Sequence, residues 1–228
     1  MSEDLPVSAS LHTLFGDIDI YLFDQLLRGR FDARRRVLDA GCGSGRNLPY
    51  LLARGFDVFA MDSDPDAVAA VRRLLAAAAP RLPADHVRVA RVDALPWPDG
   101  SMDAVISSAV LHFARDVEHF RAMVDEMWRV LAPGGLLFAR LATSISIEDR
   151  LDAPVGRVRL PDGSERFVVD EPTLLAISRS LGGRLLDPLK TTNVQHQRAM
   201  TTWVLGKQAD SGLPHDLTRR VLNPGDAG

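Results

Sequence analysis

The chain has 228 residues, of which 46% are apolar and 25% are charged, and its formal net charge is −3. This apolar content is sufficient for a buried core, so the composition excludes a disordered or fibrous protein. The slightly acidic balance gives no general attraction to phosphate backbones or anionic lipids, and we expect neither a nucleic-acid partner nor a membrane partner. The single cysteine, Cys42, excludes an intramolecular disulfide and a multi-cysteine metal site.

The first residues are acidic and lack the basic and apolar regions of a signal peptide. No stretch of about eighteen apolar residues occurs that could form a membrane-spanning helix. We therefore expect a cytoplasmic location. The spacing of the histidines and acidic residues suggests no metal site.

Apolar residues at helical spacing predict a helix over 11–31, ahead of the first strand. Strands and helices then alternate. Strands are predicted at 37–40, 57–61, 87–92, 104–107 and 136–141, and helices at 47–54, 66–79 and 117–131. Because most of these strands are separated by helices, right-handed crossovers should join them into a parallel sheet.

The pattern changes after residue 141. Asp162-Gly163 lies between two short runs of alternating apolar residues, which is typical of a β-hairpin. The elements predicted in this part are hairpin strands at 158–160 and 167–169, a helix at 172–181 and two further strands at 184–189 and 201–205. The polar segment 208–228 contains proline and glycine, and we expect it to be poorly ordered.

A glycine-rich loop follows the first predicted strand. Residues 37–45 read VLDAGCGSG, an apolar run that reaches Asp39 and then passes through three glycines spaced by one residue. Glycine accepts positive φ and has no Cβ, so the chain can turn sharply and bring its own N–H groups against a ligand. The next helix would direct its positive N-terminal end at the same place. This order of elements predicts a site for a dinucleotide or another adenosine-containing ligand.

Carboxylates follow the next two predicted strands. Asp62 ends the second strand, where a carboxylate can accept both hydroxyls of a ribose. Its alternative role is to cap the following helix, although Ser63 and Asp64 could also serve. Asp93-Ala94 follows the third strand and opens the segment DALPWPDGSMDAV.

Together, VLDAGCGSG, the acidic end of the second strand, VDALPWPDGSMDAV and WRVLAPGGLL resemble the motifs of class I S-adenosylmethionine-dependent methyltransferases, and more narrowly the small-molecule group. The resemblance covers 37–141 closely and continues loosely to 207. It implies a Rossmann-like, doubly wound α/β fold with a mostly parallel seven-stranded sheet, an antiparallel last strand and helices on both faces. It also implies S-adenosylmethionine as the cofactor, S-adenosylhomocysteine as its product and a small-molecule acceptor.

We expect a single domain over 1–207, as a monomer or homodimer. Its parts would be a helical cover at 11–31, a cofactor-binding core at 36–142, a hairpin-containing insertion at 143–170 and a closing helix and strands at 171–207.

The resemblance further implies a cofactor site built from the ends of the first four strands. The residues implied are Asp39, Gly41, Cys42, Gly43 and Gly45 for the methionine part, Asp62 for the ribose, Ser63, Asp93 and Ala94 for the adenine, and Ser107 and Ser108 for the methyl-transfer point. The Asp93 carboxylate would accept from the adenine amino group, and the Ala94 N–H would approach a ring nitrogen. A nucleophilic role for Cys42 is disfavoured because no histidine lies near it in sequence, and we expect its side chain to pack in the core.

Methyl transfer from a sulfonium is an in-line displacement, so the enzyme mainly aligns the reactants and excludes water. A general base is needed only where the attacking atom is protonated. His112, directly after the fourth strand, is the candidate base, and its alternative role is to shape the cleft wall. For the acceptor pocket we expect Tyr21, Phe113 and His196, the last with a solvated loop as its alternative. The hairpin at Asp162-Gly163 should lie over or beside the cleft.

Two other functions stay open. A nicotinamide-dependent oxidoreductase shares the glycine loop and the acidic strand end, but the Asp93-Ala94 segment and the absence of a Tyr-x-x-x-Lys pair disfavour it. A catalytically idle cofactor binder would keep the same motifs. Residues 106–109 read ISSA rather than Asn/Asp-Pro-Pro-aromatic, which disfavours nucleobase and glutamine methylation. This segment resembles that of enzymes acting on metabolites or metalloid oxyanions, including the tellurite-resistance type.

Overall fold

The computed structural model describes residues 11–209, so the sequence prediction for the tail 208–228 lies almost entirely outside the described residues. The strands of the central sheet are β1 (Arg36–Ala40), β2 (Asp57–Asp62), β3 (Val87–Val89), β4 (Met102–Ser108), β5 (Leu131–Thr143), β8 (Gly183–Leu185), β9 (Lys190–Val194) and β10 (Arg198–Lys207). Strands β6 (Gly156–Arg159) and β7 (Glu165–Val168) form a separate hairpin. The helices are α1 (Leu11–Phe15), α2 (Ile20–Leu27), α3 (Pro49–Ala53), α4 (Pro65–Ala78), α5 (Val117–Val130) and α6 (Glu171–Ser180), with 3₁₀ turns η1 (Ala84–His86), η2 (Leu111–Phe113) and η3 (Glu148–Arg150).

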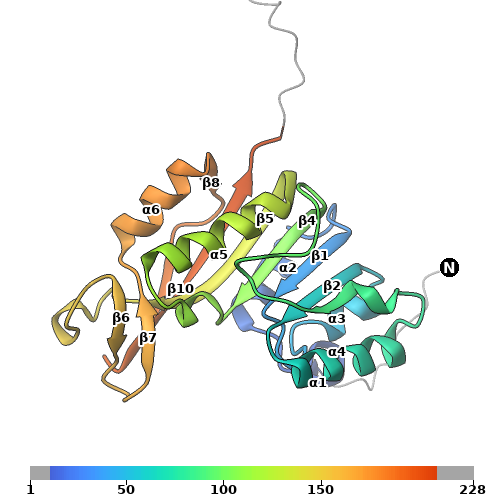
Figure 1. Ribbon diagram of the computed structural model, residues 1–228, viewed down its shortest axis with the longest axis horizontal. Helices are drawn as coiled ribbons and strands as arrows, with labels where there is room; N and C mark the ends of the chain where they lie inside the picture. Colours follow the sequence, from blue (N-terminus) through green and yellow to red (C-terminus); the bar gives the residue numbers. More distant parts are fainter. Residues whose placement is uncertain (1–10, 210–228) are drawn as a thin grey trace, which may run out of the picture.

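The central sheet has the order β3-β2-β1-β4-β5-β10-β8, and β9 also pairs with β10 (Figure 1). The five strands from β3 to β5 in this order run parallel to one another. Strand β10 runs antiparallel to β5, β8 and β9. The predicted doubly wound, mostly parallel sheet with an antiparallel last strand is therefore confirmed.

Helices cover both faces of the sheet, because the side chains of each strand alternate between two apolar clusters. One cluster joins α5 and α6 to Leu38, Val105 and Leu137, and the other joins α2, α3 and α4 to Val37 and Phe138. Both layers position the carboxyl ends of β1, β2, β4 and β5 at the same edge of the sheet (Figure 1).

The seventh position of the sheet differs from the prediction, because two short strands share it. Strand β8 pairs with one end of the long β10 and β9 pairs with the other, which brings the strand count to eight. The turn between β9 and β10 places Gln195 (φ 49°) and His196 (φ 54°) in the left-handed region, and Gln197 N–H donates to Val194 O at 2.8 Å. A two-residue turn of this kind usually carries asparagine or glycine, so the sequence lacked the usual hairpin signal.

The helix predicted over 11–31 is divided into α1 and α2. Gly16 adopts a φ of 57° after α1, and the Asp19 carboxylate caps α2 by accepting from Tyr21 N–H at 3.0 Å. The prediction of one continuous helix was wrong, since a left-handed glycine followed by a new N-cap ends one helix and begins the next. Strand β3 likewise ends at Val89, three residues earlier than predicted, where its pairing with β2 stops.

The hairpin of β6 and β7 lies at the same edge of the sheet as the carboxyl ends of β4 and β5 (Figure 1). Its Phe167 side chain is 1% exposed and stacks on Phe120 of α5, with ring centroids 5.3 Å apart. The hairpin therefore packs against the core of the protein. Within residues 11–209, none of the helices combines the length and apolar character that crossing a membrane requires.

Candidate active site

A cavity opens where the strand order reverses. The chain passes from β1 outward to β2 and β3, then returns to place β4 on the other side of β1. In open α/β sheets such a switch point leaves a crevice outside the carboxyl ends of the strands. The cavity there has a volume of about 660 Å³, and residues from the loops after β1, β2, β3 and β4 line it. This volume is in the range of small-molecule sites.

The glycine loop forms one wall of the cavity and is held against the end of β2. The N–H groups of Gly41 and Cys42 both donate to Met61 O at 2.9 Å. Gly41 has a φ of 84°, and a Cβ at this position would lie 2.5 Å from Val110 Cγ2. Only glycine fits this turn. A residue with a side chain would be strained at this φ, and its Cβ would clash with Val110. Cys42 is 4% exposed and packs in the core, and it also lines the cavity.

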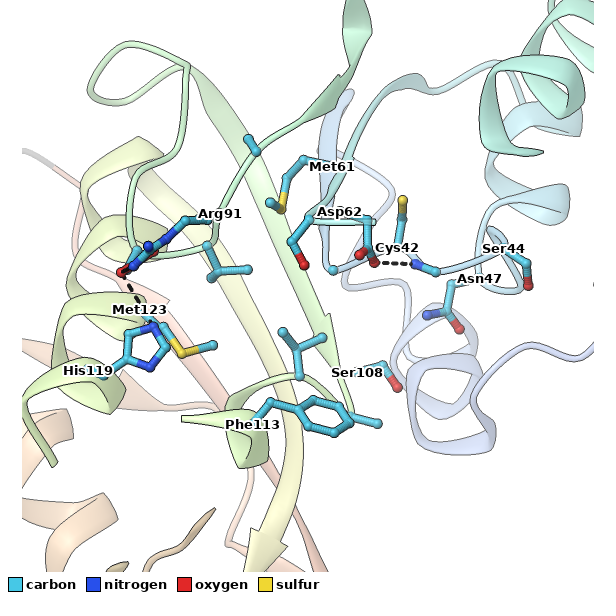
Figure 2. A pocket seen from close by; sticks show the side chains of 18 of the residues that line it. Cys42, Ser44, Asn47, Met61, Asp62, Arg91, Ser108, Phe113, His119 and Met123 are labelled. Carbon is cyan, nitrogen blue, oxygen red and sulfur yellow. Dashed lines mark hydrogen bonds and ion pairs between the residues drawn. The ribbon is translucent and has the colours of Figure 1, made fainter. Parts of the chain in front are cut away.

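Asp62 stands beside this loop at the end of β2, and Figure 2 shows its carboxylate facing the cavity. Its Oδ2 atom accepts from Gly43 N–H at 2.9 Å, and its Oδ1 atom accepts from Asp64 N–H at 3.0 Å. The cap of α4 is Asp64, whose carboxylate accepts from Asp66 N–H. Each Asp62 oxygen keeps a further lone pair for a ligand hydroxyl. Ser63, next to it, also lines the cavity.

Asp93 occupies the opposite wall, in the turn that follows β3. Its carboxylate binds the Arg91 guanidinium through both oxygens, with Arg91 Nε at 2.8 Å from Oδ1, and His119 Nε2 lies 3.4 Å from Oδ2 (Figure 2). Hydrogen bonding to Arg91 lowers the pKa of Asp93, so this carboxylate is ionised near neutral pH. Ala94 is exposed and its N–H already donates to Arg91 O at 3.1 Å.

Asp39 lies in the core beneath the cavity and does not line it. Its side chain is buried, and neither carboxylate oxygen has a hydrogen-bond partner within residues 11–209. Burial raises the pKa of Asp39 to about 7, although the positive charge of Arg46 acts in the opposite direction. The neighbouring Asn47 side chain also lowers this pKa, so Asp39 is a buried acceptor next to the glycine loop whose neighbouring side-chain donor is Asn47.

The remaining predicted cofactor residues are divided between the cavity and the core. Ser108 faces the cavity, whereas Ser107, on the opposite side of β4, is buried with its Oγ atom unpartnered within the described part of the chain. Gly45 lies under α4, where an added Cβ would come within 3.0 Å of Val71. Ser107 and Gly45 therefore contribute to the packing behind the cavity.

His112 lies behind the cavity wall that Phe113 forms. Its ring is 6% exposed, and its Nδ1 atom has no partner among the residues that the structure describes. Burial, with the positive charges of Arg166 and Arg140, lowers the pKa of His112 to about 4. Phe113 is 57% exposed and lines the cavity, and the Arg166 guanidinium of β7 lies 5.2 Å from its ring centroid. The hairpin is thus beside the cleft.

Tyr21 and His196, predicted for the acceptor pocket, do not line the cavity. Tyr21 lies behind it, with its ring 5.0 Å from the Arg140 guanidinium and its hydroxyl bonded to Thr192 Oγ1. His196 is exposed in the turn between β9 and β10.

Several cavity residues were missed by sequence reasoning. They come from the loop between β1 and α3, from the turn after β3, or from α5 and the residues just before it, and they are Arg46, Asn47, Arg91, Arg115, His119 and Met123. One available signal was position, since residues just after a strand end or in the first turns of the next helix face the switch-point crevice. Within residues 11–209, no group of three or more His, Cys, Asp and Glu side chains could hold a metal ion.

The residues present fit an adenosine-containing cofactor that also carries an amino acid group. The Asp62 carboxylate matches a ribose diol, and the glycine loop leaves room for close approach because a Cβ on Gly43 would meet no atom within 4 Å. The buried Asp39 side chain supplies hydrogen-bond acceptors near that loop.

Comparison with known proteins finds similarity to methyltransferases. A family model described as "Methyltransferase domain" matches residues 38–139. A relative from Mycobacterium tuberculosis, named "Probable S-adenosylmethionine-dependent methyltransferase", is 33% identical over 166 residues. The aligned region is 71% of this chain and 56% of the relative, so this chain spans only about half of that protein's length.

Two solved structures share the fold. The first is 1,6-didemethyltoxoflavin-N1-methyltransferase of Burkholderia thailandensis, with bound 1,6-didemethyltoxoflavin and S-adenosylhomocysteine. It is 19% identical with a TM-score of 0.61, covering 80% of this chain and 75% of that chain. The second is the cyclase SpnF, 19% identical with a TM-score of 0.62, covering 83% of this chain and 80% of that chain.

Proposed function

We propose that this chain, a member of the class I S-adenosylmethionine-dependent methyltransferases, binds S-adenosylmethionine at the switch point between β1 and β4 and moves its methyl group to a small-molecule acceptor. The observation that carries the proposal is the pairing of the glycine loop with Asp62, whose carboxylate holds the loop through Gly43 N–H while facing the cavity.

Each wall has a distinct role in this proposal. Asp62 holds the ribose hydroxyls, the glycine loop with Asp39 buried beneath it surrounds the amino acid end, and Ser63 and Asp93 border the adenine. Ser108 and Phe113 enclose the place where the acceptor meets the cofactor.

S-adenosylmethionine supplies a methyl group that its sulfonium charge has already activated. The protein's contribution is therefore alignment of the acceptor and exclusion of water. His112 supports the wall behind Phe113, since its ring is buried and its low pKa makes it a weak base. A role of His112 as base applies only to an acceptor whose attacking atom is protonated.

Thermal denaturation with S-adenosylhomocysteine tests cofactor binding. A ligand that binds only the folded state at about 100 times its Kd adds about 2.7 kcal/mol of stability. We expect a rise in Tm with S-adenosylhomocysteine, no rise with NAD(P), and loss of most of the rise in Asp62→Ala. Asp64→Ala is the matched control: it removes the α4 cap and lowers Tm, but it keeps the full ligand-induced rise. Equal stabilisation by NAD(P) would reject the proposal in favour of an oxidoreductase.

A catalytically idle binder is the second candidate, and the cyclase SpnF shows that this fold is compatible with a different named activity. Incubation with labelled S-adenosylmethionine and a metabolite extract separates the two. Label on a small molecule supports methyl transfer. Cofactor binding without any transfer supports the idle form.

A further inference from the structure

We propose that the methyl acceptor is an organic anion and that its carboxylate binds at the arginine pair, defined here as Arg46 and Arg140, beside Ser108. The inference rests on the proposed function, because it names the substrate class of the same site.

The arginine pair converges on one buried oxygen atom. Arg46 Nη2 and Arg140 Nη1 each lie 3.4 Å from Asp19 Oδ2, and Ser108 Oγ donates to that atom at 2.8 Å. The Asp19 side chain is 1% exposed. Arg46 Nη2 also donates to Ser108 Oγ at 2.8 Å. Arg46 and Ser108 line the cavity, and Arg140 is the partner of Ser108 in the β4–β5 ladder, so the pair stands at the cavity edge.

The pair holds more positive charge than its surroundings neutralise. Two guanidinium groups share one carboxylate, and both contacts are longer than the 2.7–2.9 Å or so of a direct charge-assisted bond. The Nε atom of Arg140 is buried and has no hydrogen-bond partner within residues 11–209. An unpaired buried donor such as this Nε atom is unfavourable, and a second carboxylate would pair with it and share the charge of the two guanidinium groups.

Among the residues that the structure describes, no carboxylate lines the acceptor side of the cavity, and the Asp19 carboxylate at the arginine pair is buried and already shared by both guanidinium groups. The acidic residues that line the cavity are Asp62 and Asp93, both on the cofactor side, and Asp93 is paired with Arg91. Besides the arginine pair, the Arg166 guanidinium lies against Phe113 at the border of this side. Positive side chains around one half of a cavity favour a negative ligand there and disfavour a cationic one.

The α-carboxylate of the cofactor has the same chemistry as the proposed ligand group. Arg46 directly follows the glycine loop and could meet either anion. Arg140 comes from β5, on the side of Ser108 away from that loop, and so its substitution distinguishes the acceptor from the cofactor.

The test is an incubation of the protein with labelled S-adenosylmethionine and a metabolite extract. Ion exchange then separates the products into anionic, neutral and cationic fractions. We expect label in the anionic fraction, with an acceptor KM at least about tenfold higher in Arg140→Gln and an S-adenosylmethionine KM within about twofold of wild type. Arg140→Lys keeps the charge but not the forked geometry, so its acceptor KM should lie between those of the wild type and Arg140→Gln.

Asp19→Asn should change the acceptor KM in the direction opposite to Arg140→Gln. Removal of the competing charge should lower the acceptor KM, whereas a merely structural role of Asp19 would raise it or leave it unchanged. The asparagine side chain can still cap α2. Arg121→Gln is the matched control, because it removes an exposed arginine that pairs with Asp125 on α5, and it should change neither KM. Circular dichroism verifies that each variant is folded.

Label confined to the neutral or cationic fraction would overturn the inference. So would an Arg140→Gln variant that raises only the KM for S-adenosylmethionine, since the anion would then be the cofactor's own carboxylate.

Where no transfer occurs, benzoate and benzamide serve as probes on the protein saturated with S-adenosylhomocysteine. Stronger stabilisation by benzoate that disappears in Arg140→Gln supports the anion site with an idle enzyme, and equal stabilisation by both rejects it. Failure of S-adenosylhomocysteine to bind rejects the proposed function, and the same probes on the free protein still decide the anion site.

Discussion

Two buried ionisable side chains lie behind the cavity, and burial shifts their pKa values in opposite directions. The pKa of Asp39 rises to about 7, and the pKa of His112 falls to about 4. In both cases the low-dielectric surroundings favour the uncharged form. Asp39 lies in β1 and His112 follows β4, so the stability of the protein depends on pH through side chains buried next to the cavity.

Asp39→Asn should change the pH dependence of stability. The folded-state pKa of about 7 lies above the unfolded value of 3.8, so the folded protein keeps a proton that the unfolded chain has released. Stability present below about pH 4 is then lost as the pH rises through 7, by up to about 4 kcal/mol. In Asp39→Asn this loss is absent. Urea unfolding of both proteins at pH 5 and pH 8 measures it, and parallel pH dependences would contradict the prediction.

The glycine loop contains the clearest steric requirement of the site. Gly41 and Gly163 both have a φ of 84°, but a Cβ on Gly41 meets Val110 at 2.5 Å, whereas a Cβ on Gly163 meets nothing within 4 Å. The two positions therefore separate backbone strain from crowding.

Gly163→Ala should lower the free energy of unfolding by about 1–2 kcal/mol, the penalty of a left-handed alanine. Gly41→Ala should lower it by a further 1–3 kcal/mol or so, because the added methyl group overpacks the contact with Val110. Chemical denaturation measures both variants. An equal decrease in the free energy of unfolding of the two variants would show that the loop shifts to accommodate the added methyl group.

Among the elements, the hairpin of β6 and β7 connects the border of the cavity at Phe113 to the core. Phe167 stacks on Phe120 of α5, and the neighbouring Arg166 reaches Phe113. An isolated two-stranded hairpin is marginally stable in water, so these contacts with the core determine its place. The hairpin is thus held in a fixed place next to Phe113, which lines the cavity.

Phe167→Ala should destabilise the protein by about 3–5 kcal/mol, the usual loss for a large aromatic side chain removed from a core. Arg157→Ala in the same hairpin removes only an exposed ion pair with Glu165, and it should change stability by less than about 1 kcal/mol. Urea midpoints compare the two. A loss below about 1 kcal/mol in Phe167→Ala would mean that the hairpin does not depend on the core.

At the scale of the whole molecule, β10 connects the C-terminal elements to the parallel sheet. It pairs with β5 over eight residues, and its Trp203 is buried and donates to Ser178 Oγ of α6 at 3.0 Å. Apolar clusters on both faces of the sheet continue across this junction. No break in packing divides the closing strands from the cofactor side within residues 11–209.

We therefore predict that the protein unfolds in one cooperative transition. Its three tryptophans report on separate places: Trp97 between β3 and β4, Trp128 on α5 and Trp203 on β10. Tryptophan fluorescence and far-ultraviolet circular dichroism should give the same urea midpoint. Two separated midpoints would instead indicate that the closing segment unfolds independently.

Much of this architecture could be predicted from local patterns. The alternation of apolar runs identified the five parallel strands, and the loop after β1 and Asp62 were placed correctly at one cavity because strand ends in a parallel sheet meet at one edge. Strand β9 was missed because its residues are polar and its turn uses Gln195 and His196 in place of glycine or asparagine.

The fold class and the place of the glycine loop and Asp62 could be predicted from sequence, because both depend on short-range signals: strand period, glycine spacing and the residue that ends each strand. The charged cluster beside Ser108 could be seen only in three dimensions. There Asp19, Arg46, Ser108 and Arg140 come from four separate segments, and their convergence depends on which strands are neighbours and which helix covers them. Charge balance in such a cluster is a property of three-dimensional neighbours, and no single segment of the chain records it.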